Sequence, residues 1–351
     1  MSPSRLRSRL RVLRDLGRNA VQRADVHYLV ENAIWSIRHD GLMLTQNLSQ
    51  RKGRITVRAE GIRNSILHFG SVNTWLSPDG QLRPSHDSNK RVVTWFHVVP
   101  GDRRLEHLER VADKLQLWHT SCTITRDILV EHGIDEKQIV VVPLGVDTQT
   151  FRPASLDQRQ ELRQKLEIPD DHLVIGSFQK DGEGWEAGNK PKLIKGPDIF
   201  CETLEALHNE HKLFVLLTGP ARGYVQNRLR DIGIPFTHRN CPTPDDVAPY
   251  YHALDCYLIT SRAEGGPKPM LEAMASGIPV LTTPVGMAKD ILHPGQDALV
   301  AGSEDLVEPL HNLLSDQALR EQIIQNGLST VEQYDWSRIG QRYETEIYDR
   351  L

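Results

Sequence analysis

The sequence predicts an α/β fold with two domains, each a parallel sheet covered by helices on both faces, and three observations support this. Short apolar stretches of strand length alternate with amphipathic helical stretches, which is typical of parallel α/β architecture. With 351 residues the chain is too long for one average core and suits two domains of about 150 residues each. The alternation is interrupted at residues 147–172, where Pro153 and a Pro-Asp-Asp run flank a charged helix. We therefore expect a linker at residues 151–172.

The first domain, residues 26–150, is expected to contain five strands and two helices. Its strands are expected at 26–30, 65–70, 91–96, 118–121 and 138–143, and its helices at 105–117 and 125–132. The second domain, residues 173–332, is expected to contain four strands and four helices. Its strands are expected at 173–178, 213–218, 256–260 and 279–282, and its helices at 197–209, 246–254, 267–276 and 318–332. Ligands of such sheets bind outside the carboxyl ends of the strands, so we expect a ligand cleft between the domains.

Residues 1–25 form a basic segment in front of the first predicted strand. Residues 1–23 contain seven arginines against a single acid, Asp15. Leu6, Leu10, Leu13 and Leu16 recur at helical spacing among them. A basic amphipathic helix of this kind binds an anionic membrane surface. A solvated tail and a helix packed on the body of the protein are the alternatives, and the sequence leaves all three open.

The composition is that of a soluble protein of the cytoplasm. A net charge of −4 argues against general nucleic-acid binding, which requires a basic surface. No apolar run reaches the roughly 18 residues that span a bilayer, and no signal peptide is recognisable. The four cysteines lie far apart without a C-x-x-C pair, which indicates reduced thiols and no zinc site. We expect a cytoplasmic protein, with any peripheral association at the inner face of the membrane.

The most informative stretch is residues 261–286, which read SRAEGGPKPMLEAMASGIPVLTTPVG. Glu264 follows a predicted buried strand and therefore lies at the carboxyl end of that strand. Gly265 and Gly266 have no side chains to keep a ligand away from the backbone. Pro267 suits the first turn of a helix, whose free N–H groups and dipole favour an anion such as a diphosphate.

A second acid, Glu272, lies about a turn and a half into that helix, where a carboxylate can accept hydrogen bonds from the vicinal hydroxyls of a ribose. Seven residues separate it from Glu264, and this spacing resembles the Glu-x7-Glu motif of the family-four retaining glycosyltransferases with the GT-B fold. Three further segments resemble the same family: residues 139–153, residues 178–198 ending in Lys-Gly-Pro-Asp, and the terminal helix at 333–351, which crosses back to the first domain in such proteins. The resemblance is continuous from about residue 90 and faint before it.

The resemblance implies a role for each matching residue. The implied catalytic residues are His97, Lys195 and Glu264, and the implied donor-binding residues are Gly265, Gly266, Pro267 and Glu272. Glu264 would hold hydroxyls of the donor sugar, and Glu272 the ribose of the nucleotide. Lys195 would offset charge on the departing diphosphate, and His97 would face the donor sugar. The alternatives are a surface or structural histidine and, for the two acids, solvent-facing positions on a helix.

The chain departs from the family pattern in two places. Ser177 stands where the family usually has an arginine, and a long insertion through Asn189 follows it. Lys180 either supplies the missing charge as a donor-binding residue or is an exposed lysine on a loop. The glycine-rich loop that follows the first strand in the family has Asp40-Gly41 as its candidate here.

Together these features predict a retaining glycosyltransferase that moves a sugar from a nucleotide diphosphate to a glycan or lipid-linked acceptor in polysaccharide or glycolipid biosynthesis. No Asp-x-Asp occurs in the sequence, so we expect no metal at the diphosphate and no cofactor other than the donor substrate. The alternatives are a nucleotide-sugar epimerase of the same fold and a catalytically silent scaffold that binds a sugar or nucleotide.

Overall fold

The structure is a computed structural model that describes residues 17–19, 21, 23–31, 36–99, 101–241 and 243–351. The chain forms two compact units, one comprising Met1–Pro143 with Trp336–Leu351 and the other Leu144–Asp335. Each unit contains one six-stranded sheet in which every strand pair is parallel. The predicted fold class is therefore confirmed. Most of the basic segment at residues 1–23 lies outside the described residues, so its predicted helix is not described.

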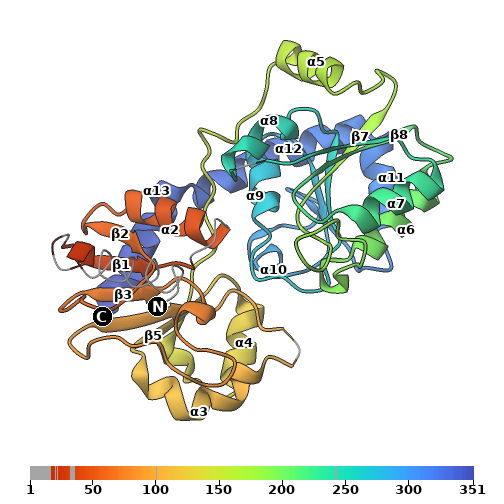
Figure 1. Ribbon diagram of the computed structural model, residues 1–351. Coiled ribbons are helices and arrows are strands. Elements are labelled where there is room, and N and C mark those ends of the chain that lie inside the picture. Colours follow the sequence, from red (N-terminus) through yellow and green to blue (C-terminus); the bar gives the residue numbers. More distant parts are fainter. Residues whose placement is uncertain (1–16, 20, 22, 32–35, 100, 242) are drawn as a thin grey trace, which may run out of the picture. The chain divides into compact units, whose positions relative to one another are not determined.

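The sheet of the first unit has the strand order β2-β1-β3-β4-β5-β6. Its strands are β1 (Val26–Leu29), β2 (Gly53–Thr56), β3 (Ile66–Phe69), β4 (Lys90–Thr94), β5 (Leu117–Thr120) and β6 (Ile139–Val141). The helices α2 (Ser36–Gln46) and α13 (Trp336–Arg342) lie on one side of this sheet, and α3 (Leu108–Val111) and α4 (Thr123–Glu131) lie on the other (Figure 1). The C-terminal segment thus completes the first unit, and it continues beyond α13 as a π-helical turn, Tyr343–Ile347.

Side chains of β3 alternate between an apolar and a polar face of this sheet. Leu67 and Phe69 pack in the apolar cluster that includes residues of α3 and α4. Between them His68 points to the other face, where its ring nitrogens bond to the Tyr348 hydroxyl (2.8 Å) and to Thr94 Oγ1 (2.7 Å). Thr94 in turn bonds to Nδ1 of His119 at 2.8 Å. The C-terminal segment is therefore held by a buried polar network as well as by apolar contacts.

The buried histidines of this network make the first unit sensitive to acid. Burial lowers the pKa of His119 to about 4 and holds the pKa of His68 well below its usual range. The unfolded chain, with an ordinary histidine pKa of about 6.5, binds these protons more readily, so stability falls as the pH drops from about 6.5 towards 4. We expect the low pKa of His119 alone to decrease the free energy of unfolding by about 2 kcal/mol when the pH is lowered from 7.5 to 5.

Urea unfolding followed at these two pH values measures this loss, and His119→Gln should flatten the profile. Replacement of the exposed His132 by Gln serves as the control and should leave the pH dependence unchanged. An unfolding free energy equal at pH 5 and pH 7.5 would contradict the account of the buried network.

The sheet of the second unit has the strand order β12-β11-β10-β7-β8-β9. Its strands are β7 (Leu173–Phe178), β8 (Leu213–Thr218), β9 (Phe236–Arg239), β10 (Cys256–Ile259), β11 (Val280–Thr282) and β12 (Leu299–Val300). The helices that cover one face are α6 (Pro197–Leu207), α7 (Gly223–Ile232) and α11 (Val307–Ser315) (Figure 1). The remaining helices are α5 (Leu156–Lys165), α8 (Ala248–Tyr251), α9 (Lys268–Ala275), α10 (Ala288–Ile291) and α12 (Gln317–Val331), of which α9 packs against α12.

The boundaries between the units differ from those placed by sequence. The chain enters the second unit at Leu144, and the segment predicted as a linker, residues 151–172, lies within it. Two arginines of α5 explain the attachment of this segment, because Arg159 and Arg163 both pair with Asp255, at 2.7 and 2.6 Å. The return to the first unit falls at Trp336, three residues after the predicted start of the crossover helix.

The helix predicted at residues 105–117 is broken into three pieces. A 3-10 turn at Arg103–His107, the one-turn α3 and a second 3-10 turn at Ala112–Lys114 replace it. The break has a local cause: the N–H of Gln116 donates to the carbonyl of Arg91 at 3.0 Å, which draws the chain into the sheet. The proposed glycine-rich loop at Asp40-Gly41 is wrong, because both residues are buried within α2.

No helix of the described residues is both long and apolar enough to cross a membrane.

Candidate functional site

Two loops meet at the carboxyl edge of the second unit's sheet. One follows β10 and runs from Thr260 to Pro267, and the other, residues 193–196, precedes α6. Thr260 Oγ1 donates to the carbonyl of Gly196 at 2.7 Å, and the N–H of Arg262 donates to the carbonyl of Ile194 at 2.9 Å. Because these hydrogen bonds join the two loops, the positions of their side chains are fixed relative to each other.

Gly196 is required at this junction. It has a left-handed conformation with φ 62°, and a Cβ there would overlap the carbonyl oxygen of Thr260. Its neighbour Pro197 opens α6, and Arg262 makes two bonds to Asp198 in the first turn of that helix, at 2.8 and 2.7 Å. The Lys-Gly-Pro-Asp sequence is therefore a turn that presents Lys195 at a fixed point beside the neighbouring loop.

Lys195 forms an ion pair with Glu264. Its Nζ donates to Glu264 Oε1, and the Ser261 hydroxyl donates to the same oxygen at 3.1 Å. The two side chains are partly exposed, Lys195 at 22% and Glu264 at 11%, so a ligand can reach them. The structure thus brings together two of the residues to which the sequence resemblance assigns catalytic roles.

A second lysine, Lys192, lies at this ion pair and was missed by sequence reasoning. It immediately precedes the 3-10 turn Leu193–Lys195, in which residues three apart face the same side. Burial lowers the pKa of Lys192, Lys195 and Lys180 lower it further, and only Glu264 opposes them. The spacing of the two lysines in Lys-Leu-Ile-Lys is the signal that could have identified it. The site therefore gathers more positive than negative charge, which suits a phosphate group.

Gly265 and Gly266 are fitted against the turn at residues 286–287. The N–H of Met287 donates to the carbonyl of Gly265 at 3.0 Å. A Cβ on Gly266 would lie 2.7 Å from Leu144 Cδ1. The small size of Gly266 is therefore used for packing within the protein, in addition to any role in ligand binding. Pro267 is the N-cap residue of α9, which begins at Lys268, so this proline lies directly before the first helical turn.

Glu272, the fifth residue of α9, is 7% exposed. Its Oε2 accepts a hydrogen bond of 2.8 Å from the hydroxyl of Tyr251, a buried residue of α8. Burial, followed by the charge of Glu272, raises the pKa of Tyr251 well above its ordinary value, so the phenol remains a donor. The ring of Phe178 lies 4.7 Å from that of Tyr251 and fixes it. Glu272 is thus a carboxylate with a fixed orientation; sequence alone did not identify Tyr251 as its partner.

Lys180 lies at the start of the insertion, which folds as a hairpin. The N–H of Lys192 donates to the carbonyl of Asp181 at 2.7 Å, and the N–H of Glu183 donates to that of Lys190 at 2.9 Å. The Nζ of Lys180 lies 3.9 Å from the ring centroid of Trp185, a cation–π contact on the hairpin.

Ser177, at the place of the family's arginine, contacts a different arginine. Arg222 Nη2 donates to Ser177 Oγ at 3.0 Å, and its Nη1 donates to the carbonyls of Ser177 and Thr218 at 2.5 and 2.8 Å. Its Nε lies 2.9 Å from Asp181, and the residue is 1% exposed. Arg222 is therefore buried under the loop that follows β7 and stabilises that loop, and its side chain is not exposed to a ligand.

His97 lies in the first unit, three residues beyond the end of β4. Its backbone carbonyl accepts a hydrogen bond of 3.1 Å from Trp95 Nε1, and Trp95 is part of the apolar core. The residue is exposed and follows the carboxyl end of a strand, which is the edge where such sheets bind ligands.

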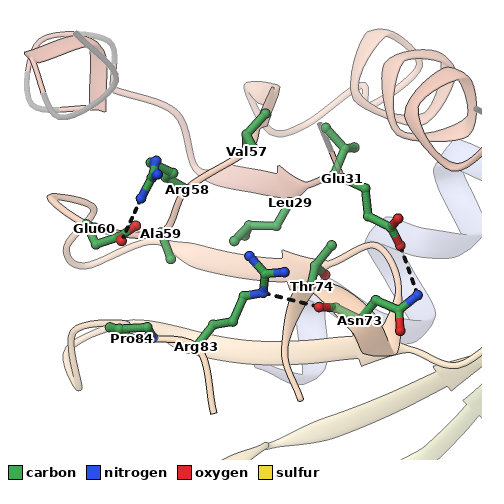
Figure 2. A pocket seen from close by; sticks show the side chains of 11 residues that line it. Leu29, Glu31, Val57, Arg58, Ala59, Glu60, Asn73, Thr74, Arg83 and Pro84 are labelled. Carbon is green, nitrogen blue, oxygen red and sulfur yellow. Dashed lines mark hydrogen bonds and ion pairs between the residues drawn. The ribbon is translucent and has the colours of Figure 1, made fainter. Parts of the chain in front are cut away.

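The first unit has a pocket at this same edge, with a volume of about 610 Å³ (Figure 2). It lies beside β1, which has β2 on one side and β3 on the other. The chain therefore changes its winding direction at this point of the sheet, which is the usual place for a ligand in an open α/β sheet. Leu29 and Ala59 form its buried apolar lining. The polar side chains that line it are those of Glu31, Arg58, Glu60, Asn73, Thr74 and Arg83.

Hydrogen bonds order the polar groups of this pocket. Glu31 Oε1 accepts from Asn73 Nδ2 at 3.1 Å and from Ser71 Oγ at 3.0 Å. Arg83 Nε donates to the carbonyl of Asn73 at 3.1 Å (Figure 2). Arg58 pairs with Glu60 at 3.3 Å, so the pocket combines two guanidinium groups with two carboxylates around an apolar floor, which suits a hydroxylated molecule.

Comparison with known proteins shows which ones this chain is similar to. Residues 187–316 match the family model described as Glycosyl transferases group 1. The chain is 26% identical over 329 residues to D-inositol 3-phosphate glycosyltransferase 1 of Catenulispora acidiphila, covering 87% of this chain and 69% of that protein. It is 25% identical over 244 residues to the D-inositol 3-phosphate glycosyltransferase of Corynebacterium aurimucosum, covering 65% of this chain and 55% of that protein.

Among solved structures, Anabaena Alr3699/HepE in complex with UDP and glucose has a TM-score of 0.74 to this chain at 14% sequence identity, covering 93% of this chain and all of that one. At that identity the likeness concerns the fold.

Proposed function

We propose that this chain, a glycosyltransferase with the GT-B fold and a glycosyl transferases group 1 domain, transfers a sugar from a nucleotide diphosphate with retention of anomeric configuration and without a metal. The observation that carries this proposal is the Lys195–Glu264 pair beside Lys192 at the carboxyl edge of the second sheet. A nucleotide-sugar presents both a diphosphate and a set of hydroxyls. Lysines suit the first, and a carboxylate suits the second.

Binding of the donor would exchange the partners of this ion pair. The Nζ of Lys195 would turn to the diphosphate, while Glu264 would accept hydrogen bonds from sugar hydroxyls, with Ser261 keeping its carboxylate in place. Glu272, oriented by Tyr251, would hold the ribose. Each new contact is charge-assisted, so the exchange replaces one ion pair by several charge-assisted hydrogen bonds.

The transfer step needs a good leaving group more than a protein nucleophile. The bond between the anomeric carbon and the diphosphate oxygen breaks, and the acceptor oxygen forms its bond from the same face. The acceptor's proton passes to the departing phosphate. Positive charge from Lys195 and Lys192 would stabilise the diphosphate as it leaves. His97 would contact the donor sugar from the first unit.

We further propose that the first unit's pocket takes the acceptor, a glycan or lipid-linked molecule with many hydroxyls. Glu31 and Asn73 can bond hydroxyls, and Arg58 and Arg83 can bond an anionic group. The relatives named above are D-inositol 3-phosphate glycosyltransferases, and the substrate in that name is a polyol that carries a phosphate.

A two-step screen tests the function. Nucleoside diphosphates and their sugars are first ranked by the rise in melting temperature that they cause. The preferred donor is then incubated with hydroxylated acceptors with and without a phosphate, and nucleoside diphosphate release and the anomeric configuration of the product are measured. Release with a retained anomer supports the proposal. Binding without turnover would identify a scaffold, and interconversion of the donor sugar alone would identify an epimerase.

Glu272→Ala should weaken nucleotide binding about tenfold or more, because a hydrogen bond to a charged group contributes roughly 1.5–3 kcal/mol. Tyr251→Phe, which keeps the carboxylate but removes its orienting donor, should give a smaller loss in the same direction. Calorimetric titration with the nucleoside diphosphate measures both. The control is Glu308→Ala, which replaces an exposed acid of α11. If the two variants bind the nucleoside diphosphate with equal affinity, Glu272 does not hold the ribose.

We also propose that residues 1–23, which are mostly outside the described residues, associate with an anionic membrane surface. Their deletion should abolish salt-sensitive sedimentation with anionic vesicles. A full-length chain that does not sediment with such vesicles would contradict this.

A further inference from the structure

We propose that Glu210, His211 and His311 form a binding site for one divalent transition-metal ion such as zinc, separate from the transfer site. His211 Nε2 lies 3.1 Å from His311 Nδ1, and His311 Nδ1 lies 3.2 Å from Glu210 Oε2. The three ligand atoms all lie within 4.8 Å of one another.

These distances fit a metal ion. Two nitrogens bound to tetrahedral zinc at about 2.0–2.1 Å stand roughly 3.3 Å apart. The separation between the two histidine nitrogens is close to this value, so an ion could enter with little movement of either ring. Two imidazoles and one carboxylate are also a common set of protein ligands for zinc, with a water molecule in the fourth position.

The backbone holds these side chains in place. Glu210 and His211 lie in the turn between α6 and β8, where both N–H groups donate to the carbonyl of Leu207, each at 3.0 Å. His311 lies on α11, and Leu204 of α6 and Leu310 of α11 share one apolar cluster. The two elements are therefore packed together before any ion binds, so binding requires little ordering.

The exposure of the cluster also suits a metal ion. The side chains of Glu210 and His311 are 59% and 41% exposed, which leaves a path for the ion to enter.

The site lies at the opposite edge of the sheet from the transfer chemistry. It precedes the first residue of β8, whereas the Lys195–Glu264 pair lies beyond the carboxyl ends of the strands. Six residues of strand span about 20 Å, so an ion here would not touch a donor diphosphate. Its effect would be to tie the α6–β8 turn to α11 and stabilise the second unit.

Zinc titration of the untagged full chain tests the proposal. Zinc at about a hundred times its dissociation constant should raise the melting temperature by about 5 °C or more. His211→Ala and His311→Gln should abolish this rise, and Glu210→Gln should reduce it. His208→Ala removes a nearby, partly exposed histidine of the same turn and should keep the full rise.

Cobalt provides a second, spectroscopic measurement that does not depend on stability. Cobalt bound by the three side chains should give the visible absorption of a four-coordinate ion, and zinc should displace it in a 1:1 ratio. His311→Gln, at a partly exposed position, should fold normally and lose this absorption. A native chain without zinc-dependent stabilisation or cobalt absorption would overturn the proposal, as would a His311→Gln variant that retains both.

Discussion

Glu264→Gln should lower the rate of sugar transfer by about a hundredfold or more at saturating donor. Glutamine has nearly the same shape, so the loop after β10 keeps its fold, but the neutral amide accepts weaker hydrogen bonds than a carboxylate does. The replacement also removes the negative charge that faces Lys195 and accepts from Ser261. Initial rates of nucleoside diphosphate release, measured with the preferred donor and acceptor, give the loss directly.

The matched control for this prediction is Glu321→Gln, an exposed acid of α12 in the same unit. It should have the native rate and melting temperature. Near-native turnover of Glu264→Gln would exclude Glu264 from the site, because no preorganised contact to the reacting sugar can be neutralised without a cost in rate.

Lys195→Ala should lower turnover by about a hundred- to a thousandfold, the range found when one preorganised charge-stabilising donor is removed. Its ammonium group would otherwise face the diphosphate as negative charge develops on the leaving oxygen. Lys195→Arg keeps the charge but changes its reach, so it should recover part of the loss. The comparison of kcat with KM distinguishes a role in the departure of the diphosphate from a role in donor binding. Loss of the first role lowers kcat more than it raises KM.

Lys190→Ala controls for the general loss of positive charge near the insertion, since this lysine is 75% exposed and pairs with Glu183 on the hairpin. It should leave the rate unchanged. Because Lys195 and Glu264 are in direct contact, the double variant should lose less activity than the product of the two single losses. Additive losses would indicate that the residues act at separate places.

The central strands of both sheets were predictable from the sequence because they are continuous apolar runs. All nine predicted strands are present, among them β3, β8 and β10. The strands that were missed, β2, β9 and β12, all lie at an edge of their sheet, and most of their residues are only partly buried. An edge strand has one unpaired side, so it can carry polar residues, as β2 and β9 do, whereas the edge strand β6 keeps an apolar run and was predicted.

The family resemblance noted on Glu264 and Glu272 is confirmed by the match of residues 187–316. These two acids could be identified in the sequence because they lie on one loop and the helix that directly follows it, at the spacing of a known motif. The contacts that these acids make could not be found in this way, because Tyr251 and Lys195 reach them only through the packing of separate elements. The assignment of Asp40-Gly41 failed for a related reason: a glycine near the first strand can serve close helix packing, and Gly41 does so against the ring of Tyr28.

The site roles of the sequence-predicted residues remain predictions, and a structure of the chain with its preferred nucleotide-sugar tests them most directly. We expect the diphosphate within hydrogen-bond distance of the Lys195 ammonium group, the ribose hydroxyls on the carboxylate of Glu272, and the donor sugar on that of Glu264. A nucleotide bound elsewhere in the second unit, with both carboxylates directed away from it, would contradict the account.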